Sequence, residues 1–163
     1  MEQLNKVEVS SATVQEMADF IIGDSLNELD NYLATVRTAF VENVELLDGD
    51  LDKIILQLPV YIYNLIVLAE NIEMKKGVAK EHSKYAQNEA MLNATGTVAD
   101  KTAKAENQTA QDRITQLAYQ TASSIVKSKI DAAMTVLDSA KKVQQRKIAE
   151  MKLTGQAGSA VGF

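Results

Sequence analysis

Apolar residues recur at the spacing of a helix face along much of the chain. Between residues 26 and 47, the large apolar side chains are three or four residues apart, which is the period of one face of an α-helix. The members of this row are Leu26, Leu29, Leu33, Val36, Phe40, Val44 and Leu47. The row predicts a helix that begins after the capping pair Ser25 and Glu28 and ends at the Asp48-Gly49-Asp50 turn.

A shorter helix is predicted before it. Thr13 and Glu16 have the spacing of a capping box, in which each side chain bonds to the backbone N–H of the other. The helix would run to Ile22, with Gly23 as its C-terminal cap, because glycine adopts a positive φ without steric cost. Residues 1–10 are expected to be frayed.

The most apolar stretch is Ile54 to Ala69, which only Gln57, Pro59 and Asn64 interrupt. Proline removes a backbone donor from a helix interior, so we expect a kink or break near Leu58-Pro59 and a helix from Val60 to Asn93. The stretch is expected to be too short and too interrupted for a membrane span, which needs roughly 20 apolar residues. A helix that is apolar nearly all round must be buried on more than one face, so the stretch predicts contact with a second copy of the chain. The expected oligomerisation residues are Ile54, Ile55, Leu58, Ile62, Leu65, Val67 and Leu68.

The chain is then expected to reverse direction at Ala94-Thr95-Gly96-Thr97. Gly96 permits a positive φ, and Thr97 with Asp100 forms a capping box for a returning helix. That helix would run from about Val98 to Leu153, and its apolar residues from Ile114 onward would pack back on the 54–69 stretch. The predicted fold is therefore all-α, an oligomeric, long antiparallel helical hairpin preceded by two shorter helices. Its expected segments are the acidic helices 1–50, the hairpin and oligomerisation region 51–153, and a disordered, glycine-rich tail 154–163.

The formal net charge of −5 is unevenly distributed. Residues 1–50 carry a net charge of −9, and residues 51–163 carry +4. Regions of opposite sign can attract one another within or between chains, or the basic region can bind a polyanion while the acidic region faces a protein partner. The chain has no cysteine, which excludes disulfides and fits a reducing cytoplasm, and the first residues lack the pattern of a signal peptide.

Lysines lie on one face of the predicted outgoing helix, because Lys76, Lys80 and Lys84 are four residues apart. They form either a solvated helix face or a row that binds phosphates, with Tyr85 available for stacking on a base. Recognised catalytic motifs are absent, including the phosphate-binding loop, the zinc-protease helix and the serine nucleophile elbow. With one histidine, His82, and no cysteine, we expect no enzyme, no cofactor and no metal site.

The segment AMLNATGTVADK, residues 90–101, resembles the tip of small helical proteins encoded in phage recombination gene clusters. In those proteins an arm crosses a G-T-V-A-acid-base tip and returns through an Ala- and Glu-rich segment into a helix with spaced lysines. The corresponding lysines of this chain are Lys127, Lys129, Lys141 and Lys142. Over about residues 51–150 the layout is similar to recombination mediators of the UvsY type. Where those proteins carry a basic residue just before the tip, this chain has Met91.

The resemblance implies a cytoplasmic homo-oligomer, in the host cell if the protein is phage-encoded, that binds single-stranded DNA and helps to load a recombinase. A recombinase and a single-strand-binding protein would be its further partners, and no membrane is involved. The implied nucleic-acid-binding residues are Lys76, Lys80, Lys84, Lys101 and Lys104. The alternative is a phage-encoded oligomeric helical scaffold, adaptor or inhibitor that acts through protein–protein contact without nucleic acid.

Overall fold

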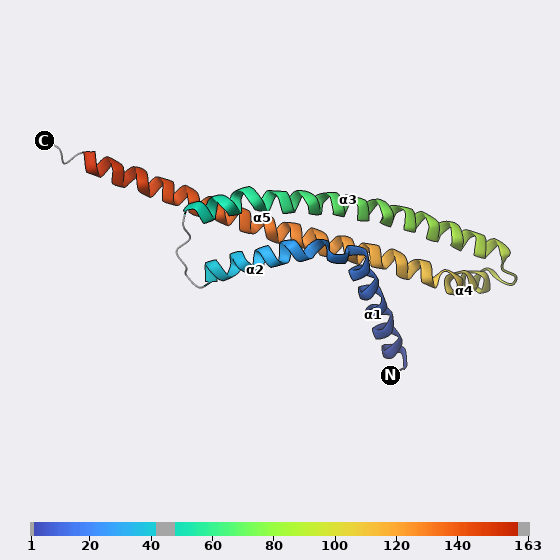
Figure 1. The fold of residues 1–163 in the computed structure, drawn as a ribbon. Helices are drawn as coiled ribbons and strands as arrows, with labels where there is room; N and C mark the ends of the chain where they lie inside the picture. The colour runs from blue at the N-terminus through green and yellow to red at the C-terminus, as the bar shows by residue number, and fades with distance from the viewer. Residues whose placement is uncertain (1, 42–47, 160–163) are drawn as a thin grey trace. The chain divides into compact units, whose positions relative to one another are not determined.

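The structure is a computed structural model that describes residues 2–41 and 48–159, with side chains described over 11–38, 49–107 and 109–153. Over these residues the chain is helical and contains no β-strand, which confirms the all-α prediction. The elements are α1 (Glu2–Ile22), the 3₁₀ helix η1 (Gly23–Leu26), α2 (Asn27–Val41), α3 (Asp48–Asn93), α4 (Val98–Gln108) and α5 (Ala110–Ser159) (Figure 1).

The chain forms two compact units. Unit 1 comprises Met1–Leu26 and Ile66–Ser128, and unit 2 comprises Asn27–Leu65 and Lys129–Phe163. Helices α3 and α5 each contribute one part to unit 1 and one part to unit 2. Each unit therefore has its own hydrophobic core.

The first helices differ from the prediction at their ends. Helix α1 begins at Glu2, so Thr13 lies inside the helix and residues 2–10 are helical. Gly23 has a φ of +55°, which confirms its role at the end of α1. Helix α2 is described as far as Val41, and residues 42–47, which the prediction includes in this helix, lie outside the described residues.

Helix α3 is longer than predicted at its N-terminal end. It begins at Asp48, so the expected turn at 48–50 belongs to its first turn, and it continues unbroken through Pro59. The helix tolerates Pro59 because its neighbours are held in the core of unit 2. Leu58 is completely buried, and Ile54 and Ile62 are nearly so. Burial of these side chains on both sides of the proline offsets the loss of one backbone hydrogen bond.

The predicted turn between the two long helical regions is confirmed. Gly96 has a φ of +120°, and α4 begins after Thr97. The Thr97 backbone N–H donates to Asp100 Oδ2 at 3.1 Å, and the Asp100 N–H donates to Thr97 Oγ1 at 3.3 Å. These two bonds are the predicted capping box.

The returning helix is interrupted once, at Thr109, between α4 and α5. Thr109 is buried, and its hydroxyl and its backbone N–H both donate to the Ala105 carbonyl, at 2.9 and 3.0 Å. Helix α5 then extends to Ser159, so residues 154–159 are helical where a disordered tail is predicted. The rest of that tail, residues 160–163, lies outside the described residues.

The core of unit 2 contains leucine and isoleucine from α3 and, from α5, two alanines together with one isoleucine and one leucine. Its buried residues on α3 are Leu51, Ile54, Leu58, Ile62 and Leu65, and those on α5 are Ile130, Ala133, Leu137 and Ala140. In unit 1, α5 buries Ala118, Ala122, Ser123 and Val126. Only some of the apolar α5 residues expected to pack back on α3 are buried. Ile130 and Leu137 are in the core, whereas Leu117 and Met134 are about half exposed.

Candidate functional site

Two of the five predicted phosphate-binding lysines are paired with acidic residues of their own helix. Lys76 Nζ lies 3.0 Å from Glu73 Oε2, and Lys84 Nζ lies 2.9 Å from Glu81 Oε1. The Lys84 hydrogen bond, its charge and the charge of Lys80 lower the pKa of Glu81. The lysine row is therefore partly neutralised by glutamates one turn away.

The lysines of the return arm serve different local roles. Lys104 Nζ donates to the Thr95 carbonyl at 3.2 Å, so this lysine helps to hold the turn between α3 and α4. Lys101 is half-buried. Among the described residues, Lys80 and Lys101 form no hydrogen bond or ion pair. The depression that includes Lys80 and Lys84 has neither Lys101 nor Lys104 in its lining.

Lys80 and Lys84 instead line a polar depression of about 260 Å³ in unit 1. Its lining comes from the second half of α3, the end of α4 and the start of α5, and comprises Lys80, Ser83, Lys84, Gln87, Glu106, Arg113 and Gln116. Three cations and one carboxylate therefore face a small volume in a protein whose formal net charge is −5. The sequence analysis missed Arg113, because it lies 29 residues after Lys84 and only the packing of α5 against α3 brings it close.

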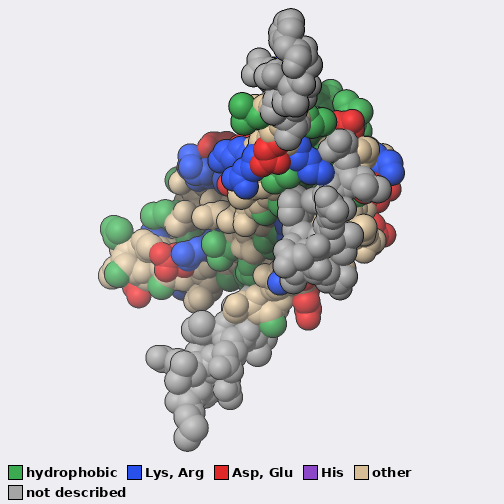
Figure 2. Space-filling view, turned by 90° about the vertical axis from the view of Figure 1, so that its left-hand side faces the viewer, with side chains coloured by type: hydrophobic (Ala, Val, Ile, Leu, Met, Phe, Trp, Pro, Cys, Tyr) green, Lys and Arg blue, Asp and Glu red, His purple; other side chains and the backbone are tan. Residues whose placement is uncertain are grey.

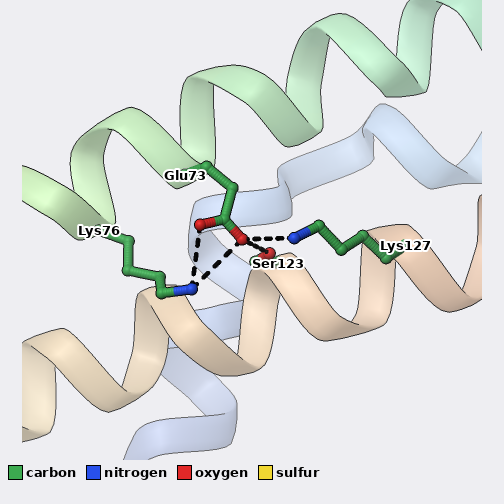
Figure 3. A network of polar contacts seen from close by, with 4 residues as sticks. All are labelled: Glu73, Lys76, Ser123 and Lys127. Atoms are coloured by element: carbon green, nitrogen blue, oxygen red, sulfur yellow. Dashed lines mark hydrogen bonds and ion pairs between the residues drawn. The ribbon is translucent and has the colours of Figure 1, made fainter.

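A polar cluster of unit 1 centres on Glu73 of α3 (Figure 3). Glu73 Oε1 accepts from Ser123 Oγ at 2.5 Å and from Lys127 Nζ at 2.6 Å, while Lys76 donates to both carboxylate oxygens. Hydrogen bonds from Lys127, Ser123 and Lys76 lower the pKa of Glu73 to about 2. The cluster holds α3 against α5 through a carboxylate that is ionised at neutral pH.

The predicted oligomerisation residues divide into buried and exposed groups. Ile54, Leu58, Ile62 and Leu65 are buried in the core of unit 2 within the protomer, so their contact with a second chain stays a prediction that this burial does not favour. Ile55 and Leu68 are half-buried, and Val67 is 40% exposed.

Other apolar side chains of α3 are more exposed than any of the predicted set. In unit 2 these form an uncovered row of Leu56, Val60 and Tyr63, exposed by 72%, 58% and 66%. In unit 1 a second uncovered row consists of Met74, Val78 and Tyr85. Steps of three, four or seven residues place the members of each row on one helix face.

A second depression of unit 1, of about 370 Å³, lies beside the second row and is bordered by Met74, Val78, His82 and Tyr119. His82 Nδ1 lies 3.6 Å from Asp112 Oδ1, and the His82 side chain is exposed. Within the described residues, no three His, Cys, Asp or Glu side chains are grouped so that they could hold a metal ion.

Basic residues are also concentrated near the end of α5 in unit 2. Figure 2 shows Lys and Arg side chains gathered on one part of the face in view. The part of α5 after residue 140 carries Lys141, Lys142, Arg146, Lys147 and Lys152. Lys141, Lys142 and Arg146 are exposed.

By length and composition, one helix among the described residues, Gly49–Asn93 within α3, could cross a membrane. The expectation that the 54–69 stretch is too short and too interrupted for a span stays a prediction, since length and composition alone do not decide it. The finding is weak evidence for a span, because the core helix of a soluble protein passes the same test.

No protein-family model, curated protein or solved structure matches this chain. The resemblance to recombination mediators therefore rests on the residues of the turn and its flanking arms alone.

Proposed function

We propose that this protein is an oligomeric helical scaffold or adaptor that acts through protein–protein contact. The observation that carries the proposal is the row of Leu56, Val60 and Tyr63 on α3, whose side chains are each more than half exposed. The opposite face of the same helix segment is buried in the core of unit 2. Contiguous exposed apolar side chains of this size mark interaction surfaces.

The scaffold would be a long antiparallel hairpin of α3 against α4 and α5. Contacts within each unit support this arrangement. In unit 1, Glu73 pairs with Lys127 and His82 with Asp112, so residue numbers fall along α5 as they rise along α3. In unit 2, Gln144 donates to Asp52 at 2.6 Å.

A second copy of the chain is the proposed first partner of the row. Each side chain of the row would gain roughly 1.5–3 kcal/mol if it were fully buried in such a contact. The second row, Met74, Val78 and Tyr85, gives unit 1 a comparable surface for a further copy or for a different protein.

Light scattering or sedimentation at micromolar concentration tests this proposal. We expect an oligomeric mass for the wild type, and a monomeric mass for Val60→Glu and Tyr63→Glu with unchanged helicity by circular dichroism, because both side chains are exposed within the protomer. The matched control is Ala132→Glu, which adds the same charge at an exposed position of α5 in unit 2 and should leave the mass unchanged. A monomeric wild type would contradict the proposal.

A second candidate function is a single-strand-binding recombination mediator of the UvsY type. It is favoured by the exposed cations of α5, by the absence of ion pairs to Lys80 and Lys101 among the described residues, and by the sequence of the turn. Its partners would be single-stranded DNA, a recombinase and a single-strand-binding protein in the cytoplasm.

A titration with single-stranded DNA at two salt concentrations separates the two candidates. A mediator should bind without base specificity, and its affinity should fall steeply with salt. Joint replacement of Lys80, Lys84 and Lys101 by Ala should weaken binding and leave the oligomer intact. Without any binding at low salt, only the scaffold function would stand.

A further inference from the structure

We infer that the polar depression of unit 1, lined by Lys80, Ser83, Lys84 and Arg113, is a binding site for a terminal phosphate group. This site goes beyond the scaffold function and does not depend on it. Its ligand class is a phosphomonoester or pyrophosphate, whose charge exceeds that of a phosphodiester.

The donors of the site match a tetrahedral oxyanion. Lys80 and Arg113 form no ion pair with a described residue, so each can offer its N–H groups to a ligand. The Arg113 guanidinium can bind two oxygens at once, and Lys80 supplies further positive charge, whereas Lys84 is paired with Glu81 at 2.9 Å. Gln87 and Gln116 add side-chain amide donors.

Ser83 is the observation that distinguishes this site from a chance group of surface lysines. Ser83 is only 8% exposed and borders the depression. Its hydroxyl forms no hydrogen bond with any described residue. The hydroxyl oxygen is not sealed from solvent, because no fully buried side-chain N or O atom among the described residues lacks a hydrogen-bond partner, so an oxyanion in the depression can accept its proton. Ser83 therefore supplies a donor that points to a ligand.

The size and charge of the site favour a single phosphate group over a strand of nucleic acid. A volume of about 260 Å³ holds a phosphate or pyrophosphate with a few waters. The carboxylate of Glu106, also in the lining, opposes an anion, so a ligand with a high charge density is needed to gain net attraction. A dianionic monoester meets this requirement better than a singly charged diester.

Calorimetric titration with pyrophosphate on the full chain tests the site. We expect saturable binding to the wild type, and a loss of about tenfold in affinity for Arg113→Gln, because a charge-assisted hydrogen bond is removed. Arg113→Lys, which retains the charge and is the safer variant for folding, should bind with intermediate affinity, and Ser83→Ala should lose about threefold. Glu106→Gln should gain about threefold, because it removes the opposing charge.

The matched control is Lys53→Gln, which removes one positive charge from an exposed position on α3 in unit 2. It should bind pyrophosphate like the wild type. Equal losses for Lys53→Gln and Arg113→Gln, or no effect of Glu106→Gln, would overturn the inference, because binding would then depend on net charge alone. Circular dichroism on each variant confirms that the fold is retained.

Competition against pyrophosphate identifies the source of the phosphate group. Displacement by glycerol phosphate would assign a small phosphomonoester as the ligand, and displacement only by a 5′-phosphorylated oligonucleotide would assign a strand end. Both results support the site. If an unphosphorylated oligonucleotide of the same sequence displaces pyrophosphate equally well, internal phosphodiesters are being bound, and the inference is wrong.

Discussion

At the scale of single residues, Glu73 is the side chain that connects the most partners across α3 and α5 in the described part of unit 1. One carboxylate accepts from a serine, from a lysine of the opposite helix and from a lysine of its own helix. Such a group stabilises the folded state only while it is ionised. Its lowered pKa therefore makes the stability of the protein depend on pH.

Replacement of Glu73 by Gln should lower the free energy of unfolding near neutral pH by roughly 1 kcal/mol, a value reduced for solvent screening because the side chain is about one third exposed. The pKa falls from 4.5 to about 2 on folding, so the carboxylate stabilises the protein fully above pH 4.5. This contribution is lost as the pH falls through about 2. Urea unfolding at several pH values should show the difference between wild type and variant shrinking below pH 4.5.

The control is Glu70→Gln, which removes an exposed carboxylate from the same helix three residues earlier. Its effect on unfolding near neutral pH should be small. A Glu73→Gln variant as stable as the wild type near neutral pH would show that the cluster contributes nothing to folding.

The local interactions of the turn between α3 and α4 were predictable from the sequence, whereas the capping box predicted at Thr13 and the distant contacts were not. Thr97 and Asp100 are three residues apart, so their reciprocal hydrogen bonds follow from residue type and spacing, and so does the positive φ of Gly96. The pairing of Glu73 with Lys127 joins residues 54 apart. By residue type alone, many other lysines could have paired with Glu73. Only the register of α3 against α5 brings Lys127 to it.

At the scale of elements, the exposure of the predicted apolar residues on α5 has a packing explanation. Large apolar residues were expected to face α3, but α5 buries Ala118, Ala122, Ala133 and Ala140 completely. Small side chains let helix backbones approach closely and move the longer residues to the flanks. The hydrophobic period identified the helix, but it did not identify which of its residues form the contact.

Helix α3 gives the element-scale prediction at Pro59. The proline is exposed within an unbroken helix and cannot donate to the Ile55 carbonyl one turn earlier. Pro59→Ala would restore that hydrogen bond, and it should raise the free energy of unfolding by about 2 kcal/mol after allowance for the larger entropy of the unfolded chain. Denaturant unfolding measures the change, with Asn64→Ala, an exposed position one turn later, as a control expected to gain less. A less stable Pro59→Ala variant would mean that α3 depends on the geometry that the proline imposes.

At the scale of the whole molecule, the unequal charge of the chain offers a rival explanation for assembly. Residues 1–50 carry −9 and residues 51–163 carry +4, so copies could attract each other through opposite charges alone. The exposed rows of α3 indicate a different force, since Leu56, Val60 and Tyr63 carry no charge. Apolar burial and charge attraction respond to salt in opposite ways.

The oligomer should therefore survive high salt. At about 1 M NaCl, charges on the surface are screened beyond about 3 Å, so an assembly held by opposite charges would dissociate. An assembly held by the apolar rows should keep its mass or associate more strongly, because excluded salts strengthen apolar burial. Light scattering of the wild type in low salt and in about 1 M NaCl distinguishes these outcomes, with Val60→Glu as the dissociated reference. A wild-type mass that falls to that of the variant at high salt would assign assembly to the acidic and basic regions and would leave the apolar rows for a different protein partner.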